Sequence, residues 1–176
     1  MLANTTSVYN ACVRTGRKLG MDAFQAGLLT AIDADVPKPV AGSAVRVCQV
    51  GINTADAHDK LNAFNRHKIS RDNLCSKPFA MLVRSNTSMR VFIKNMPVEV
   101  LRNSVLVYSM WEGYRGQQSI MSFLNFCESA GMKIISLHTS GHADTAAIKA
   151  VISATKPEVT IPVHTLAAGK FKALTV

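Results

Sequence analysis

The stretch SVLVYSMWEGYRGQQSIMSFLNFCESAGMKIISL, residues 104–137, carries the strongest fold signal in the sequence. It opens with a near-continuous apolar run, residues 104–110, which is typical of a strand buried on both faces. Apolar residues then recur at helical spacing up to Gly131 and predict a helix: Ile120, Phe123, Leu124 and Cys127. A second strand is expected at residues 133–137. The order strand, helix, strand indicates a βαβ unit with parallel strands.

The same alternation extends in both directions along the chain. Residues 145–154 predict another helix, and residues 159–163 another strand. Towards the N-terminus, Asp22 is a candidate N-cap for a helix. Three further segments have strand character: residues 17–21, 45–50 and 79–83. The sequence therefore predicts an α/β protein with a mainly parallel sheet.

The composition is that of a basic globular protein. The chain has 176 residues, of which 48% are hydrophobic, and its formal net charge is +9. An acidic partner is plausible for such a chain, and nucleic acid is the first candidate. No apolar run approaches the roughly 20 residues of a membrane span, so we expect no membrane insertion.

The cysteines and the N-terminus indicate a cytoplasmic protein. Cys12, Cys48, Cys75 and Cys127 are widely spaced and form no CxxC motif. Such spacing suits neither a zinc knuckle nor a disulfide scaffold, so we expect reduced and mostly buried thiols. The first ten residues, MLANTTSVYN, lack the layout of a secretory signal.

Histidines gather after two of the predicted strands. His138 and His142 follow the strand at residues 133–137, and His164 follows the strand at residues 159–163. Loops at the carboxyl ends of parallel strands meet at one edge of a sheet. A lone histidine is usually an ordinary surface or core residue, but three converging histidines favour a site. Neutral imidazole binds zinc or manganese and can also transfer protons near pH 7.

Ser140 and Gly141 in the first of these loops have two readings. Glycine allows a close backbone approach and serine adds a donor, as suits an anion at a helix N-terminus. The alternative is that Ser140 simply caps the following helix. The residues alone do not favour one reading over the other.

The motifs HTSGHAD at residues 138–144 and KPEVTIPVHT at residues 156–165 resemble a known family. They look like the C-terminal part of β-CASP nucleases of the metallo-β-lactamase fold, of the ribonuclease J kind. His164 follows His142 by 22 residues, the spacing of the family's two landmark histidines. The upstream segment SVYNACVRTGRKLGMDAFQAGLL, residues 7–29, is similar to the β-CASP part. The resemblance implies a β-CASP-like lobe at residues 1–115 and a metallo-β-lactamase portion at residues 116–176.

The resemblance also implies roles for individual residues. His142 would be the catalytic proton donor beside the scissile phosphate, and His164 would be a metal ligand. His138, Ser140 and Gly141 would bind the phosphate backbone of the substrate. The complete enzyme would use zinc or manganese, and RNA would be its substrate.

The family's main metal motif, H-x-H-x-D-H, does not occur in this sequence. We therefore expect a fragment that is inactive alone and is completed by a missing N-terminal metallo-β-lactamase half or by a second chain. We also expect only weak metal binding by this chain, since one ligand does not hold a metal. Two alternatives remain open: a non-catalytic nucleic-acid-binding or assembly module, and a hydrolase of the same fold with a non-nucleic substrate. An incomplete fold exposes apolar surface, so a homo-oligomer is expected.

A few other residues could contact a substrate, but an ordinary structural role is at least as well supported for each. Trp111 and Tyr114 could stack on a base, but core packing is the favoured interpretation, because most aromatic side chains pack. Arg84 could face a substrate groove, although a surface ion pair is more ordinary. A basic group could contact RNA phosphates or simply be a solvated helix end: Arg14, Arg17 and Lys18.

Overall fold

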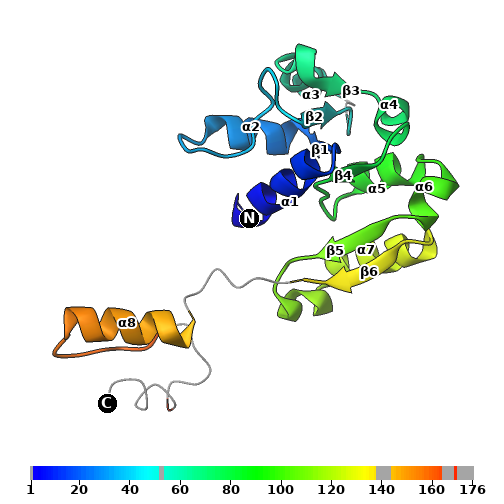
Figure 1. The fold of residues 1–176 in the computed structure, drawn as a ribbon. Coiled ribbons are helices and arrows are strands. Elements are labelled where there is room, and N and C mark those ends of the chain that lie inside the picture. Colours follow the sequence, from blue (N-terminus) through cyan, green and yellow to red (C-terminus); the bar gives the residue numbers. More distant parts are fainter. Residues whose placement is uncertain (1, 52–53, 138–143, 164–168, 170–176) are drawn as a thin grey trace. The chain divides into compact units, whose positions relative to one another are not determined.

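The computed structural model describes residues 2–51, 54–137, 144–163 and 169. It separates into two compact units, Met1–His138 and Thr139–Val176 (Figure 1). The described part has α/β structure in which all strand pairs are parallel, so the predicted fold class is confirmed. The domain boundary near residue 115 concerns the family of each part and stays a prediction.

The first unit contains a four-stranded sheet of order β3-β2-β1-β4. Its strands are β1 (Lys18–Asp22), β2 (Val45–Cys48), β3 (Lys68–Ile69) and β4 (Phe79–Met81). In the register, Leu19 of β1 pairs with Val45 of β2 on one side and with Ala80 of β4 on the other. The strand order thus reverses direction between β1 and β4. In open parallel sheets such a reversal is the usual place for a ligand.

Helices connect these strands as the sequence predicts at several points. α1 (Leu2–Arg14) leads into β1, α2 (Ala23–Ala31) joins β1 to β2, and α3 (Ala55–Asn62) precedes a short 3-10 turn, Asn65–His67. Asp22 is the N-cap of α2 and forms a capping box with Gln25, which confirms its predicted role. A buried core lies around this sheet: Cys12, Leu19, Met21, Ala26, Leu29, Val45, Val47 and Leu61.

The second sheet consists of β5 (Val105–Tyr108) and β6 (Lys133–Ser136), joined by α7 (Gln118–Ser129). α7 lies against one face of this sheet (Figure 1) and buries the four apolar residues of its predicted stripe: Ile120, Phe123, Leu124 and Cys127. Gly131 ends the turn after α7 with a φ of 89°, a conformation that favours glycine. One continuous core links this layer to the first sheet, because Cys48 and Ile69 pack in the same cluster as Leu106.

Three short helices are missing from the sequence prediction. They are α4 (Arg71–Cys75), α5 (Thr87–Lys94) and α6 (Val98–Arg102), and the short strand β3 is missing from it as well. α5 and α6 are held by tertiary packing, since Met89, Phe92, Ile93 and Leu101 are buried in the shared core. Helices of five to eight residues have little intrinsic stability, so propensity alone predicts them poorly.

The expectation that β5 is buried on both faces is wrong. Its residues alternate, with Leu106 and Tyr108 buried and Val105 and Val107 exposed. The register places Val105 beside Lys133 and Val107 beside Ile135 on the same side of the sheet. We call these four residues the outer face. The opposite face, with Leu106 and Tyr108, is buried in the same core cluster as α7.

The second unit contains α8 (Thr145–Thr155), close to the predicted helix. Asp144 caps it by accepting a 2.7 Å hydrogen bond from the N–H of Ala147. The predicted strand at residues 159–163 is absent, because no strand among the described residues of this unit pairs with it. Its three aliphatic side chains are strongly exposed: Val159, Ile161 and Val163.

The four thiols are free, and the expectation of mostly buried cysteines is confirmed, since only Cys75 is partly exposed. Burial raises the pKa of Cys48 to about 12 and that of Cys127 to about 11. Because the thiolate is the form that reacts and binds metal, these side chains are packing groups. The cytoplasmic location stays a prediction. Within the described residues, no helix combines the length and apolar character needed to cross a membrane.

The outer face generates a prediction about assembly. We expect the chain to self-associate through Val107 and Ile135, because contiguous bare apolar surface is unusual on a monomer. Val107→Lys should lower the association constant at least about tenfold, the effect of roughly 1.4 kcal/mol. Light scattering over a range of concentrations measures this. The matched control is Val40→Lys, an equally exposed valine in a loop. A wild-type chain that stays monomeric throughout would contradict the prediction.

Candidate functional site

The five predicted site residues lie outside the described part of the chain. His138, Ser140, Gly141 and His142 fall in residues 138–143, and His164 falls in residues 164–168. Their proximity to one another is therefore untested. The described residues that lead into the first segment are those of β6, so the site is built here from the edge of the β5–β6 sheet.

An aromatic cluster stands at the carboxyl edge of this sheet, and we define it as Tyr108, Trp111 and Tyr114. Tyr108 ends β5, and its buried phenol donates a 3.1 Å hydrogen bond to the carbonyl oxygen of Trp111. The backbone N–H of Tyr114 donates to the same carbonyl at 3.0 Å. The two outer rings meet edge to face, with centroids 5.5 Å apart and planes at 90°. Local bonds therefore fix the loop that carries the rings.

Arg115 connects this loop to the end of β6. Its guanidinium lies 4.7 Å above the centre of the Tyr108 ring. One terminal nitrogen, Nη2, donates a 2.6 Å hydrogen bond to Oγ of Ser136, the last residue of β6. Its Nε forms a 2.8 Å ion pair with Glu112. Burial, followed by the negative charge of Glu112, raises the pKa of the Tyr108 phenol, so Tyr108 remains a hydrogen-bond donor.

The outer two rings of the cluster are not core residues. Trp111 is 58% exposed and Tyr114 is 42% exposed. The favoured interpretation from sequence, core packing, is therefore wrong for both. One feature of the sequence pointed to exposure: Gly113 stands between the two aromatic residues and is typical of a turn at the surface.

The described residues do not fit a metal site. No group of three or more His, Cys, Asp or Glu side chains comes together among them. The two described histidines, His58 in α3 and His67 in the following 3-10 turn, belong to no such group. The described part of the chain therefore gives no basis for a catalytic step through zinc or manganese.

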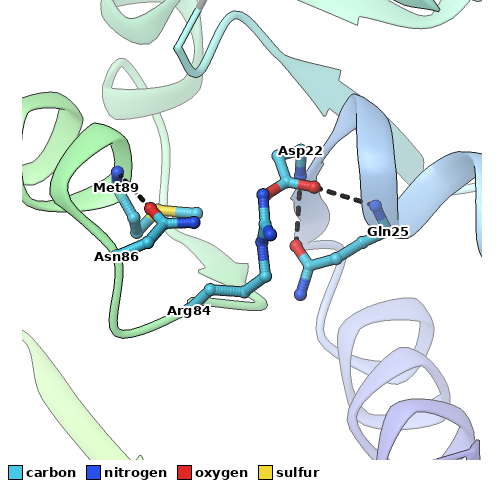
Figure 2. Close-up of polar contacts among 5 residues, drawn as sticks. All are labelled: Asp22, Gln25, Arg84, Asn86 and Met89. Atoms are coloured by element: carbon cyan, nitrogen blue, oxygen red, sulfur yellow. Dashed lines mark hydrogen bonds and ion pairs between the residues drawn. The ribbon is translucent and has the colours of Figure 1, made fainter. Parts of the chain in front are cut away.

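A second polar cluster fills the place where the strand order reverses. Asp22, at the carboxyl end of β1, is 2% exposed. Arg84, three residues beyond β4, reaches it with Nη2 at 2.6 Å and Nε at 2.7 Å from Oδ2 (Figure 2). The other carboxylate oxygen of Asp22 accepts a 2.8 Å hydrogen bond from the backbone N–H of Gln25. The Arg84 guanidinium also lies 4.8 Å above the ring of Phe24.

The Asp22–Arg84 ion pair occupies the switch point, which is the place between β1 and β4 where the strand order reverses. We call this ion pair the joint, because it holds the two strand ends together. The carboxylate of Asp22, which could have bound a ligand, already has its partners. Arg84 links the end of β1 to the segment that follows β4. Arg84 therefore forms an ion pair, as the favoured interpretation of the sequence predicted, but its partner Asp22 is buried and does not lie at the surface. The next residues continue the joint, since Asn86 accepts a 2.9 Å hydrogen bond from the N–H of Met89 and so caps α5 (Figure 2).

Two other surfaces were candidates for a site, but neither gathers reactive side chains. The predicted basic group near the start of β1 is solvated, with Arg14 and Arg17 exposed and Lys18 partly buried. An open hollow of about 580 Å³ lies between α1 and residues 34–43. Its lysine, Lys38, already donates a 2.7 Å hydrogen bond to the carbonyl of Ile32. Neither surface brings together groups that would perform a reaction.

Comparison with known families adds one finding. Residues 131–174 match the family model of the zinc-dependent metallo-hydrolase RNA specificity domain. The matched region begins just before β6 and includes α8, so it contains all five predicted site residues. The match supports a relative of the metallo-β-lactamase superfamily with a module for RNA specificity. No curated protein and no solved structure matches the chain significantly.

The joint at Asp22 can be tested by unfolding. Arg84→Met leaves a buried carboxylate without its counter-charge. We expect a loss of about 2–3 kcal/mol, less than the roughly 3–5 kcal/mol of a fully buried pair because the Arg84 side chain is 38% exposed. Urea titrations followed by circular dichroism measure the loss.

The matched control for this substitution is Lys60→Met, which removes the exposed 2.6 Å pair between Lys60 and Asp56. It should cost no more than about 0.5 kcal/mol. Equal effects of the two substitutions would show that the Asp22–Arg84 pair has no special structural role.

Proposed function

We propose that this chain is the RNA-binding part of a metal-dependent hydrolase of the metallo-β-lactamase superfamily, of the β-CASP, ribonuclease J-like kind. The observation that carries the proposal is the match of residues 131–174 to an RNA specificity domain. That region starts at a strand, β6, which is paired in parallel with β5. The net charge of +9 suits a polyanionic partner.

Within this proposal, each predicted site residue keeps its role. His138, Ser140 and Gly141 hold the phosphate backbone, and His142 donates a proton to the leaving oxygen. An imidazole suits that task because its pKa lies near physiological pH. His164 is the single metal ligand that this chain would contribute, so further ligands must come from other residues of a complete enzyme or from a second chain.

A second candidate function is a non-catalytic assembly module. The observation that favours it is the outer face of β5 and β6, where Val105 and Val107 are about half exposed. A protein partner that supplies a second layer would bury this face. The two candidates differ in their forecast for the histidines, because a non-catalytic module needs neither His142 nor His164 for its function.

RNA binding by the chain is the first test. We expect binding to single-stranded RNA that weakens steeply with salt, because phosphate contacts release counterions. Contacts with about four phosphates would give a slope near −3 in a plot of log K against log salt. Fluorescence anisotropy of a labelled oligouridylate measures it, with the uncharged dye alone as control. No binding even at low salt would refute the proposed function.

The catalytic roles need a preparation with a complete metal site, either as a longer chain or with the second chain. His142→Ala should lower turnover by about 100- to 10,000-fold, with the metal content unchanged. His164→Ala should lower both metal content and turnover. RNA cleavage and elemental analysis are measured together, with His67→Ala as the control histidine. If all variants cleave like the wild type, the nuclease assignment is wrong.

A further inference from the structure

We propose that Trp111 and Tyr114 form a stacking site for a nucleobase of single-stranded RNA, held in position by Gly113. The inference rests on the proposed function, because it assumes that RNA is the partner. It goes beyond that function by assigning base contact to the loop after β5, outside the region matched by the RNA specificity domain.

Exposure is the first observation behind the site. Trp111 is 58% and Tyr114 42% exposed, although both belong to residue types that usually pack. Exposed aromatic rings are unfavourable in water, and a flat ligand that covers them would remove this surface from water. Stacking of a base on an aromatic ring contributes about 1–3 kcal/mol and tolerates any base, because every base has a π face.

Rigidity is the second observation. The carbonyl of Trp111 accepts hydrogen bonds from both the Tyr108 phenol and the Tyr114 N–H, and the latter bond belongs to the short 3-10 helix Glu112–Gly116 that follows Trp111. These bonds hold the backbone between the two rings. A Cβ atom at Gly113 would overlap the six-membered ring of Trp111, which therefore lies directly over this glycine. Gly113 is not one of the glycines with positive φ, so the indole and not the backbone requires it. A ring fixed in advance loses little entropy when it binds.

Location is the third observation. β5 and β6 are parallel neighbours, so the aromatic rings after β5 lie at the edge of the sheet where β6 also ends. The bond from Arg115 to Ser136 ties that loop to the end of β6. β6 lies inside the region that matches an RNA specificity domain.

The size of the exposed pair favours a base over a protein. Two rings on a short loop offer the area of one or two stacked bases, whereas a stable protein interface buries about 1,200 Å² or more. The Arg115 guanidinium beside them holds the two strand ends together through Tyr108 and Ser136, and its charge is paired with Glu112, so stacking and not charge carries the preference for a base. A protein partner on the adjoining outer face is the rival, and the experiment below includes it.

The chain offers a direct probe, since Trp111 is its single tryptophan. Stacking of a base should quench Trp111 emission, and the quenching should saturate with the same Kd as the anisotropy of a labelled oligouridylate of about 12 nucleotides, within the usual site sizes. An abasic strand with the same phosphates should bind more weakly and leave the emission unchanged. This comparison separates base contact from phosphate contact.

Four variants test the assignment by their Kd for the oligouridylate. Trp111→Ala should weaken binding between about 5- and 150-fold, the equivalent of about 1–3 kcal/mol. Tyr114→Ala should weaken it in the same direction, and Trp111→Phe should restore most of the affinity because a ring remains. Gly113→Ala should weaken binding with both aromatics still present, which a mere loss of hydrophobic surface would not produce. Circular dichroism verifies that each variant is folded.

The matched control is Phe24→Ala, an aromatic residue of similar exposure, 55%, beside the first sheet. It should bind RNA like the wild type. If the wild type binds but the Trp111 and Gly113 variants bind equally well, the stacking site is wrong and the proposed function stands. If the wild type does not bind RNA at all, the proposed function itself fails. Variants that lose self-association in light scattering and keep RNA affinity would assign the cluster to a protein interface and overturn the inference.

Discussion

The buried carboxylate of Asp22 is the constraint around which the first sheet is built. It must find partners where water cannot reach it, and it finds Arg84 beyond β4 and the first turn of α2. One side chain thereby joins the end of β1, the start of α2 and the segment that follows the neighbouring strand β4. The same arrangement fills the switch point where many α/β proteins bind ligands. The carboxylate of Asp22 is therefore occupied by these partners and is not free to bind a ligand.

The second sheet, β5 and β6, exposes both an edge and a face. At the edge, the loop of Trp111 and Tyr114 is held by hydrogen bonds, by the Arg115 contacts and by the close packing of an indole on Gly113. On the outer face, Val107 and Ile135 lack a covering layer in the first unit. The edge suits a flat, polar ligand such as RNA, and the face suits a protein layer. Both features fit the function that we propose for the chain.

Periodicity in the sequence predicted much of the fold. It predicted β1, β2, β4, β5, β6, α7, α8 and the Asp22 cap, because strong local patterns and a capping residue act over a few neighbouring positions. It missed α4, α5 and α6, since such short helices depend on the core that they help to build. It also predicted a strand at residues 159–163, but a strand exists only when another strand pairs with it.

For the site, the sequence determined the chemistry of the candidate residues, namely the histidines of HTSGHAD and PVHT and their spacing. Those motifs are contiguous, so the chain carries them whatever its fold. Only the tertiary structure decided that Arg84 pairs with Asp22, 62 residues away, and that Trp111 and Tyr114 face solvent. The physical reason is that exposure and charge pairing depend on which elements cover a residue, and distant parts of the chain supply those elements.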